Sequence, residues 1–364
     1  MTTHIRDLRD VADLRLRVQG LAQPRFHGLA DAVGFFGAIQ SQDIGPSEWA
    51  VAQRCVDGGS RAEIVRSLAS GEVLRTHVLR PTWHWVAATD IRAWLRLTGP
   101  RVLVQNGSYM RKFGVAQDVL DKSHAAIEHA LRGGRSLPRS ALDEALRQTG
   151  IDTSELRLVL IVMHAELTGL ICSGPEPKQP TYGLLDERVP PEPPSDRDDD
   201  LVRMTLRYFA SHGPATEKDF QWWSSLTLAD IRRAIDLIRD DLSVVEVDGH
   251  TLWYVDMELP DASSTTANLI YILDEYVVGY RESRSAADEA GFESQVTAVR
   301  ELPQGVVLVD GQVVGRWSTS RRSPVGGPKT VLYRELETDE EAALESATLQ
   351  HARFWAGEPV GEAT

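Results

Sequence analysis

The sequence predicts an α+β protein in which short helices precede β-hairpins and the C-terminal part is mainly β. Three stretches share the order of short helices, a strand, a tight turn and a second strand, with hairpins expected within residues 73–86, 171–185 and 244–255. Short helices followed by a hairpin are the plan of the winged helix, a variant of the helix-turn-helix. From residue 264 the pattern is mainly β, and a small barrel or a curled sheet would satisfy the strand edges.

The first predicted unit combines helical spacing with capping signals. Apolar residues recur at helical spacing over residues 26–39, and Ser47 is expected to cap a second helix. Ser60 and Glu63 form a capping box that opens a third helix. Alternating apolar and polar residues then predict the hairpin, and another helix is expected from Asp90.

The later units follow from the same signals. Helices are expected over residues 138–148, 154–170, 201–211, 216–224, 228–239 and 339–355. Residues 186–200 contain four prolines and an acidic run, which predicts a linker. Asp-Gly pairs at 248–249 and 310–311 supply the positive φ values of type I′ turns, so each is expected to close a hairpin.

Charge is distributed unevenly along the 364-residue chain, whose formal net charge is -14. Residues 1–150 carry 20 Lys and Arg against 15 Asp and Glu, whereas residues 151–364 carry 19 against 38. The average argues against a polyanionic partner, because nucleic-acid binding depends on cations that displace counterions. The uneven distribution instead indicates an electropositive face in the first part, with solvated surface charge as the alternative.

Several enzyme classes are excluded by missing motifs. The sequence lacks Gly-x-Gly-x-x-Gly, a Gly-Lys-Ser/Thr phosphate loop, His-Glu-x-x-His and Gly-x-Ser-x-Gly. Cys55 and Cys172 lie far apart without zinc-ligand spacing, so neither a disulfide nor a metal site is expected. Because the N-terminus is polar and acidic and no apolar run approaches about 18 residues, we expect an intracellular, cytoplasmic protein.

A polar segment, Gln-Ser-Gln-Asp at residues 40–43, follows the apolar stretch of the first unit. The amide side chains of Gln40 and Gln42 diverge if a helix continues through them, but converge if it unwinds there. Convergence would create a site for chemistry. The alternative is an ordinary polar helix end in which Asp43 bonds to the backbone of the turn.

Basic and aromatic residues alternate on the first hairpin. Arg75 and His77 are expected on one face of its first strand, and Thr82 and His84 on one face of the second. Such a hairpin could enter a DNA groove or support a base by stacking. Alternatively its tryptophans pack on the neighbouring helices, and its histidines are satisfied structural groups.

Adjacent carboxylates at Asp274 and Glu275 are a third candidate, since such pairs can serve acid–base chemistry. The favoured interpretation is structural, with the carboxylates capping an element and pairing with Arg281. Trp222 and Trp223 are interpreted as core residues.

Four ordered blocks together resemble the winged-helix DNA glycosylases of the AlkZ/YcaQ type. They are Gln-Ser-Gln-Asp at 40–43, Leu-Arg-Thr-His-Val-Leu-Arg-Pro-Thr-Trp-His-Trp-Val at 74–86, Gly-Pro-Ala-Thr-x-x-Asp-Phe-x-Trp-Trp at 213–223, and Asp-Glu-Tyr-Val-Val-Gly-Tyr-Arg at 274–281. The resemblance implies three tandem winged helices at residues 1–99, 100–190 and 199–258, and a C-terminal β-barrel at 264–364, in a C-shaped DNA clamp.

The resemblance also implies a monofunctional DNA glycosylase that excises N-alkylated purines such as N7-alkylguanine, and some family members unhook interstrand crosslinks. The implied partner is double-stranded DNA carrying alkylated purines, in the nucleoid, with no cofactor, metal, membrane or obligate protein partner. The family's Gln-Φ-Gln signature maps onto Gln40 and Gln42, and Ser41 departs from the apolar middle residue. Asp43 is a further catalytic candidate, as an anion beside the developing cation.

The residues expected to contact DNA are Arg75, His77, Arg80, Thr82, His84, Arg111 and Lys112. The hairpin departs from the family at residue 81, where this chain has proline and similar members tend to have glycine. Two other classes remain open. A DNA-binding regulator would give a sequence-specific footprint without base release, and a protein-interaction scaffold would show no salt-dependent DNA affinity.

Overall fold

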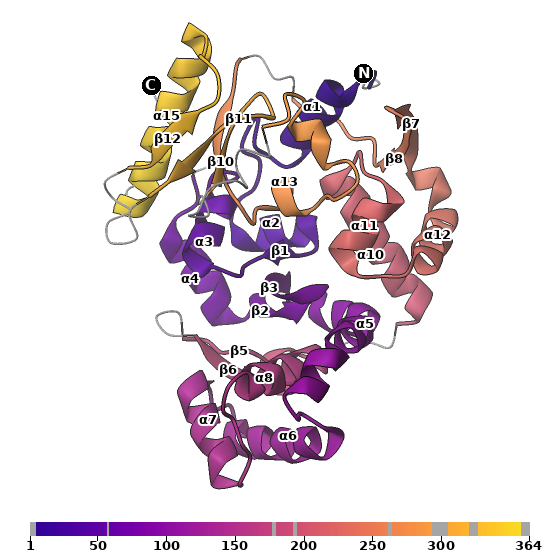
Figure 1. The fold of residues 1–364 in the computed structure, drawn as a ribbon, viewed down its shortest axis with the longest axis vertical. Coiled ribbons are helices and arrows are strands. Elements are labelled where there is room, and N and C mark those ends of the chain that lie inside the picture. The colour runs from indigo at the N-terminus through magenta and orange to yellow at the C-terminus, as the bar shows by residue number, and fades with distance from the viewer. Residues whose placement is uncertain are drawn as a thin grey trace. The chain divides into compact units, whose positions relative to one another are not determined.

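The computed structural model contains helices and strands in a mixed order, which confirms the α+β class (Figure 1). It describes residues 5–56, 58–176, 180–191, 195–260, 264–292, 305–319 and 327–357. None of the helices in these ranges combines the length and the apolarity needed to cross a bilayer.

The chain forms two compact units, and each has its own core. Unit 1 comprises Met1–Ile64, Val202–Trp223 and Thr227–Thr364, and unit 2 comprises Val65–Leu201 with Ser224–Leu226. Unit 2 is therefore inserted into the sequence of unit 1. The predicted module boundaries at residues 99, 190 and 258 stay predictions.

Unit 1 holds most of the helices near the two termini and the C-terminal strands. Its elements are α1 (Leu8–Val18), α2 (Leu29–Phe36), β1 (Ile39–Gln40), α3 (Ile44–Ala52), the first turn of α4 (Arg61–Ser70), most of α10 (Arg197–His212), α11 (Glu217–Ser224), α12 (Leu228–Leu237), η1 (Arg239–Asp241), β7 (Ser243–Val247), β8 (His250–Tyr254), β9 (Ala267–Tyr271), α13 (Glu275–Val278), η2 (Arg284–Ala287), β10 (Gly305–Val309), β11 (Gln312–Ser318), β12 (Lys329–Leu332) and α15 (Thr338–Ala356).

The second helix, α2, is shorter than predicted, because Gly37 adopts a φ of 79° and ends it at Phe36. The prediction that Ser47 caps the next helix is wrong. The cap of α3 is Asp43, whose backbone is extended, and Ser47 lies within the first turn. Pro46 also fits this first turn, where a backbone N–H has no partner within the helix.

Two Asp-Gly hairpins form as predicted. Asp248 and Gly249 have φ values of 50° and 74° between β7 and β8, and Asp310 and Gly311 have values of 45° and 77° between β10 and β11. The predicted succession of helices and a hairpin also occurs in the first two of the three stretches singled out in the sequence, where the hairpins are β2–β3 and β5–β6. Their assignment as winged helices stays a prediction.

The C-terminal strands form an open antiparallel sheet in the order β12-β11-β10-β9, and the expected closed barrel is not found among the described residues. Among the described strands, β12 and β9 each pair with one neighbour and form the edges of the sheet. Helices α3 and α15 pack against the sheet instead. Trp49 of α3 and Phe354 of α15 share a buried cluster with Leu269, Val307 and Trp317 of the strands.

Unit 2 contains the β2–β3 hairpin, a small sheet that includes β5 and β6, and several helices. Its elements are β2 (Val73–Val78), β3 (Arg80–Ala87), α5 (Ile91–Lys112), α6 (Gln117–Leu131), β4 (Leu137–Pro138), α7 (Arg139–Gln148), α8 (Arg157–Leu167), β5 (Ile171–Ser173), β6 (Thr181–Leu184) and α9 (Leu185–Arg188), and the sheet has the order β4-β6-β5.

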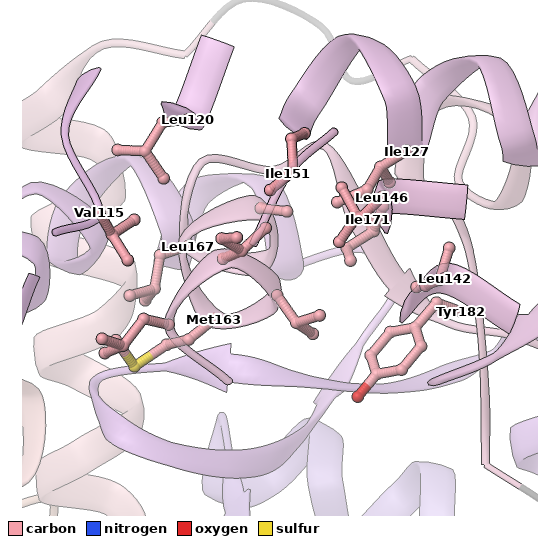
Figure 2. Close-up of a cluster of buried hydrophobic side chains, with 14 of the residues drawn as sticks. Val115, Leu120, Ile127, Leu142, Leu146, Ile151, Met163, Leu167, Ile171 and Tyr182 are labelled. Atoms are coloured by element: carbon pink, nitrogen blue, oxygen red, sulfur yellow. The ribbon is translucent and has the colours of Figure 1, made fainter. Parts of the chain in front are cut away.

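The core of unit 2 joins these helices to its sheet (Figure 2). Ile127 of α6, Leu142 and Leu146 of α7, and Ile161 of α8 are all fully buried beside Ile171 of β5. Burying a side chain of this size contributes roughly 1.5–3 kcal/mol. The core therefore holds α8 firmly, and α8 in turn packs against the β2–β3 hairpin through β2.

The predicted linker at residues 186–200 is partly helical. Helix α9 extends to Arg188, and α10 begins at Arg197. Asp200 in this segment is 2% exposed, because its carboxylate pairs with the guanidinium of Arg96 at 2.9 Å. The acidic run suits the start of α10, because negative charge in the first turn of a helix is favoured by the helix dipole.

Candidate active site

The Gln-Ser-Gln-Asp segment lies in unit 1, where the backbone leaves α2, forms β1 and enters α3. The helix predicted to run through Ile39 has ended by then, so the segment is not helical: Gln40 lies in β1, and the chain bends at Gln42 and Asp43. Gln40 is 6% exposed and Ser41 is fully buried, whereas Gln42 is half-buried and Asp43 is exposed. A buried Ser41 occupies the position where the family pattern has an apolar residue, and it does not turn outward.

The peptide groups around Gln40 are held from two directions. The backbone N–H of Gln40 donates to Oε1 of Glu275 at 2.7 Å. The hydroxyl of Ser47 lies 3.1 Å from the carbonyl oxygen of Gln40 and 2.8 Å from that of Asp43. Ser47, expected as a helix cap, therefore ties the first turn of α3 to this segment.

The Asp43 carboxylate accepts a hydrogen bond from the phenol of Tyr271 in β9. Burial, and then the bond to Asp43 and its charge, raise the pKa of Tyr271 well above its usual range. The phenol therefore keeps its proton and remains a donor. Asp43 occupies the N-cap position of α3, but its side chain makes no hydrogen bond to the helix. The hydrogen bond from Tyr271 therefore orients this carboxylate.

Asp274 caps an element as predicted, since its side chain accepts from the backbone N–H of Tyr276 at the start of α13. The predicted pairing with Arg281 is wrong. Asp274 pairs with Arg54 through two contacts of 2.6 and 2.8 Å, and the backbone N–H of Arg281 donates to Asp219. Arg54 and Asp274 expose 3% and 1% of their side chains, so this is a buried bidentate pair.

The prediction that Trp222 and Trp223 are core residues is correct for Trp223. Trp223 is fully buried, and its indole N–H donates to Oε2 of Glu275 at 3.0 Å. Trp222 is 41% exposed and donates to the carbonyl of Val278. Both tryptophans therefore contact the α13 turn that carries the Asp-Glu pair.

Unit 2 carries the hairpin predicted to contact DNA, and its register separates the candidates onto two faces. Arg75 and His77 share a face with Trp83, which lies opposite His77. Nδ1 of His77 lies 2.5 Å from Oε2 of Glu166 in α8, and the indole of Trp83 donates to Oε1 of the same carboxylate at 3.2 Å. This face is therefore bound to α8, and His77 is 3% exposed.

The other face carries Arg80, Thr82 and His84. Nδ1 of His84 lies 2.9 Å from the Thr82 carbonyl oxygen, and Nε2 lies 3.4 Å from a guanidinium nitrogen of Arg80. An imidazole that donates from Nδ1 can accept at Nε2, so one tautomer satisfies both contacts. Arg80 is 8% exposed and His84 is fully buried, which favours a structural role for the histidine.

Arg111 and Lys112 end α5 and are exposed. They are basic residues in the last turn of a helix, where positive charge is favoured by the helix dipole. Among the described residues, no group of three or more His, Cys, Asp or Glu side chains is arranged to hold a metal ion. Cys55 and Cys172 are buried free thiols, and burial raises the pKa of each to about 12.

Comparison with known proteins identifies the family to which these features belong. A family model described as DNA glycosylase AlkZ-like matches residues 33–354. The chain belongs to the AlkZ-like DNA glycosylase family. It is accordingly a DNA glycosylase, a DNA repair enzyme whose substrate is DNA.

A solved relative has the same fold. The Streptomyces sahachiroi DNA glycosylase AlkZ matches with a TM-score of 0.78 and 21% sequence identity, over 97% of this chain and 98% of that one. A comparison with curated proteins gave no match. The residues that surround the candidate site, above all Glu275 and Tyr271, had no local sequence signal that pointed to Gln40 or Asp43.

Proposed function

We propose that this DNA glycosylase hydrolyses the N-glycosidic bond of N-alkylated purines of the N7-alkylguanine type. Such a base is already cationic, so it leaves without much acid catalysis, and the sugar passes through an oxocarbenium-like state. The oxygen of a water molecule bonds to C1′, the electron pair of the C1′–N9 bond leaves with the base and neutralises its charge, and one proton passes to solvent.

Gln40 and Gln42 position the water in this mechanism. A neutral amide cannot take up a proton at neutral pH, but its carbonyl accepts from a water molecule and its N–H group orients it. Asp43 lies next in the chain as an oriented anion that stabilises the developing positive charge on the sugar.

The observation that carries the proposal is the anchored backbone of the Gln-Ser-Gln-Asp segment. Hydrogen bonds hold its peptide groups at Gln40 and Asp43, while Gln42 between them is half-buried and Asp43 is exposed. Side chains on a fixed backbone with access to solvent are what a water-positioning site requires. Gln40, which is 6% exposed, contributes from the buried side.

A monofunctional mechanism fits the distribution of amines. A glycosylase that also cleaves the strand uses an amine to form a Schiff base with the sugar. The chain has five lysines, and the first of them is Lys112. Unit 1 contains Lys218, which pairs with Glu282 at 2.5 Å, and Lys329 of β12, and neither belongs to the Gln-Ser-Gln-Asp segment. We take water as the nucleophile.

DNA contacts are proposed at the predicted cationic and polar residues that retain exposure. Arg111 and Lys112 are exposed, and Arg75 and Thr82 are half-buried. The buried Arg80, His77 and His84 support the hairpin through the contacts described above. Reaching the target bond requires the base to be unstacked, which costs a few kcal/mol and least at a damaged site. Unhooking an alkylpurine crosslink breaks the same kind of bond, so it is part of the proposal.

The test uses duplex DNA containing N7-methylguanine and a second duplex with an N7-linked interstrand crosslink. We expect the wild-type protein to release free base and leave abasic sites, and Gln42→Ala to lose release while its DNA affinity is unchanged. The control is Gln148→Ala, at an exposed glutamine on α7 whose amide donates to Glu144 at 3.0 Å. Unchanged release by Gln42→Ala would refute the glutamine mechanism, and DNA binding by the wild type without base release would favour a non-catalytic DNA-binding protein.

A further inference from the structure

We propose that Glu275 is a positioning residue for base release: its buried carboxylate fixes the backbone of Gln40 and is itself fixed by His212 and Trp223. The inference rests on the proposed function, because it assigns the residue that holds the water-positioning segment in place. All four residues belong to unit 1.

The carboxylate uses both oxygens. Oε1 accepts from the backbone N–H of Gln40 at 2.7 Å. Oε2 lies 3.1 Å from Nε2 of His212 and accepts from the indole N–H of Trp223 at 3.0 Å. Glu275 is 2% exposed, and a carboxylate at that depth is retained only when such donors compensate its desolvation.

His212 is held rigidly on the far side of Glu275. Its ring is fully buried and stacks on Tyr208 with centroids 4.7 Å apart and an interplanar angle of 11°. The α13 turn approaches this ring so closely that a Cβ at Gly279 would lie 2.6 Å from Cδ2 of His212. The glycine therefore permits the contact between α10 and the turn that carries Glu275.

The turn is also fixed from the side of α3. Asp274 caps α13 and is held by the bidentate pair with Arg54. Glu275 is the next residue, so the helix cap, the ion pair and the two aromatic donors set the position of its carboxylate. A carboxylate held in this way is a fixed hydrogen-bond acceptor for the Gln40 N–H group.

The fixed position of the Gln40 peptide group matters because Gln42 follows Gln40 by two residues. Ser47 holds the Gln40 carbonyl, Glu275 holds its N–H, and the backbone between Gln40 and Asp43 therefore has little freedom. A displacement of about 1 Å in a positioned group can cost about 100-fold in rate. The chemistry of water positioning thus depends on Glu275, although Glu275 does not touch the water.

Glu275→Gln tests this dependence with a minimal change in shape. Glutamine has one acceptor oxygen and one donor NH₂ group in place of two acceptors. If the oxygen faces Gln40, the NH₂ group meets the indole N–H of Trp223, and if it faces Trp223, the NH₂ group meets the Gln40 N–H. Either orientation places a donor against a donor.

Three further variants accompany it. Glu275→Asp keeps the charge but shortens the side chain, so the carboxylate cannot reach Gln40 and the two aromatic donors together. Ser47→Ala removes the other anchor and suits a helix, because alanine has the highest helix propensity. The control is Ser123→Ala, at a fully buried serine on α6 of unit 2 whose hydroxyl donates to the Val119 carbonyl at 2.7 Å.

Single-turnover release of N7-methylguanine and the Kd for the same duplex are measured for each folded variant. We expect release to be about 100-fold slower in both Glu275 variants and slower in Ser47→Ala, with Kd unchanged, and normal in Ser123→Ala. A folded Glu275 variant with the wild-type rate overturns the inference, and so does a wild-type rate in Ser47→Ala if neither Glu275 variant folds. Slower release in Ser123→Ala would also overturn it, since the loss of any buried hydroxyl would then suffice. Absence of release by the wild type would instead be a failure of the proposed function.

Discussion

The ion pair between Arg54 and Asp274 provides the sharpest test of the energetics of unit 1. Asp274→Asn preserves the shape of the side chain and the acceptor for the backbone N–H of Tyr276. It leaves the Arg54 guanidinium buried without its counterion, and it places an NH₂ group against one of the guanidinium nitrogens. The hydrogen bonds that Arg54 keeps with the Ala50 carbonyl at 2.5 Å and with Oε1 of Gln19 at 3.3 Å are to neutral groups.

The expected loss in the free energy of unfolding is large for a substitution that replaces one carboxylate oxygen by an NH₂ group. Removing one partner of a buried ion pair costs about 3–5 kcal/mol, and the side chains here expose only 3% and 1%. Total stabilities of domains are about 5–15 kcal/mol, so the variant should lose a substantial part of the stability of unit 1. The Arg239–Asp236 pair, with side chains 57% and 68% exposed, is the matched control, and Arg239→Ala should cost at most about 1 kcal/mol.

The assay is urea denaturation followed by circular dichroism, with hydrogen exchange to assign the change to peptides of unit 1. We expect a lower midpoint for Asp274→Asn and faster exchange in the segment at 202–223. A loss below about 1 kcal/mol, equal to that of the control, would refute the reasoning, because it would mean that solvent reaches the pair and compensates the charge.

Three other predictions concern DNA binding, pH and catalysis. Replacing Arg111 and Lys112 with alanine should reduce the slope of log Kd against log salt by about 2, since each phosphate contact contributes about 0.9; an unchanged slope would remove both from the DNA interface. Burial, followed by the neighbouring imidazole, lowers the pKa of His164 to about 4, so unit 2 should lose stability as pH falls from about 6.5 toward 4. His164→Leu should flatten that decline in thermal denaturation, and a decline of the same steepness would contradict the assignment. Tyr271→Phe should slow base release about tenfold at unchanged DNA affinity, because Asp43 loses the donor that orients it; wild-type release would show that this orientation is unimportant.

Local signals predicted the elements well where one residue type determines the backbone. The Asp-Gly turns at 248–249 and 310–311 and the capping box of Ser60 and Glu63 are found as expected, because each depends on residues within a few positions. Helix α1 was not predicted. Its periodicity is broken by Arg15, which is 2% exposed because its guanidinium donates to the carbonyls of Pro214 and Ser283.

The sequence singled out the Gln-Ser-Gln-Asp segment but not its surroundings. The segment was expected at the end of a helix, whereas α2 ends at Phe36 and Gln40 lies in β1. Its anchor Glu275 lies 235 residues away along the chain. The nearest basic residue downstream, Arg281, was the natural partner for Asp274, and the real partner is 220 residues distant. Such pairings arise from tertiary structure, which spacing along a chain does not encode.

The insertion of one unit into the other also has a consequence for biosynthesis. Residues of α1 pack against β8, β9 and β10, so their burial must wait until those strands have left the ribosome. The inserted unit is nearly complete much earlier, at Leu201. At about 5–20 residues per second, the N-terminal helices remain without their strand partners for roughly tens of seconds. The nascent chain therefore exposes the apolar side chains of α1 until the last of these strands is made, long after most of unit 2 has been synthesised.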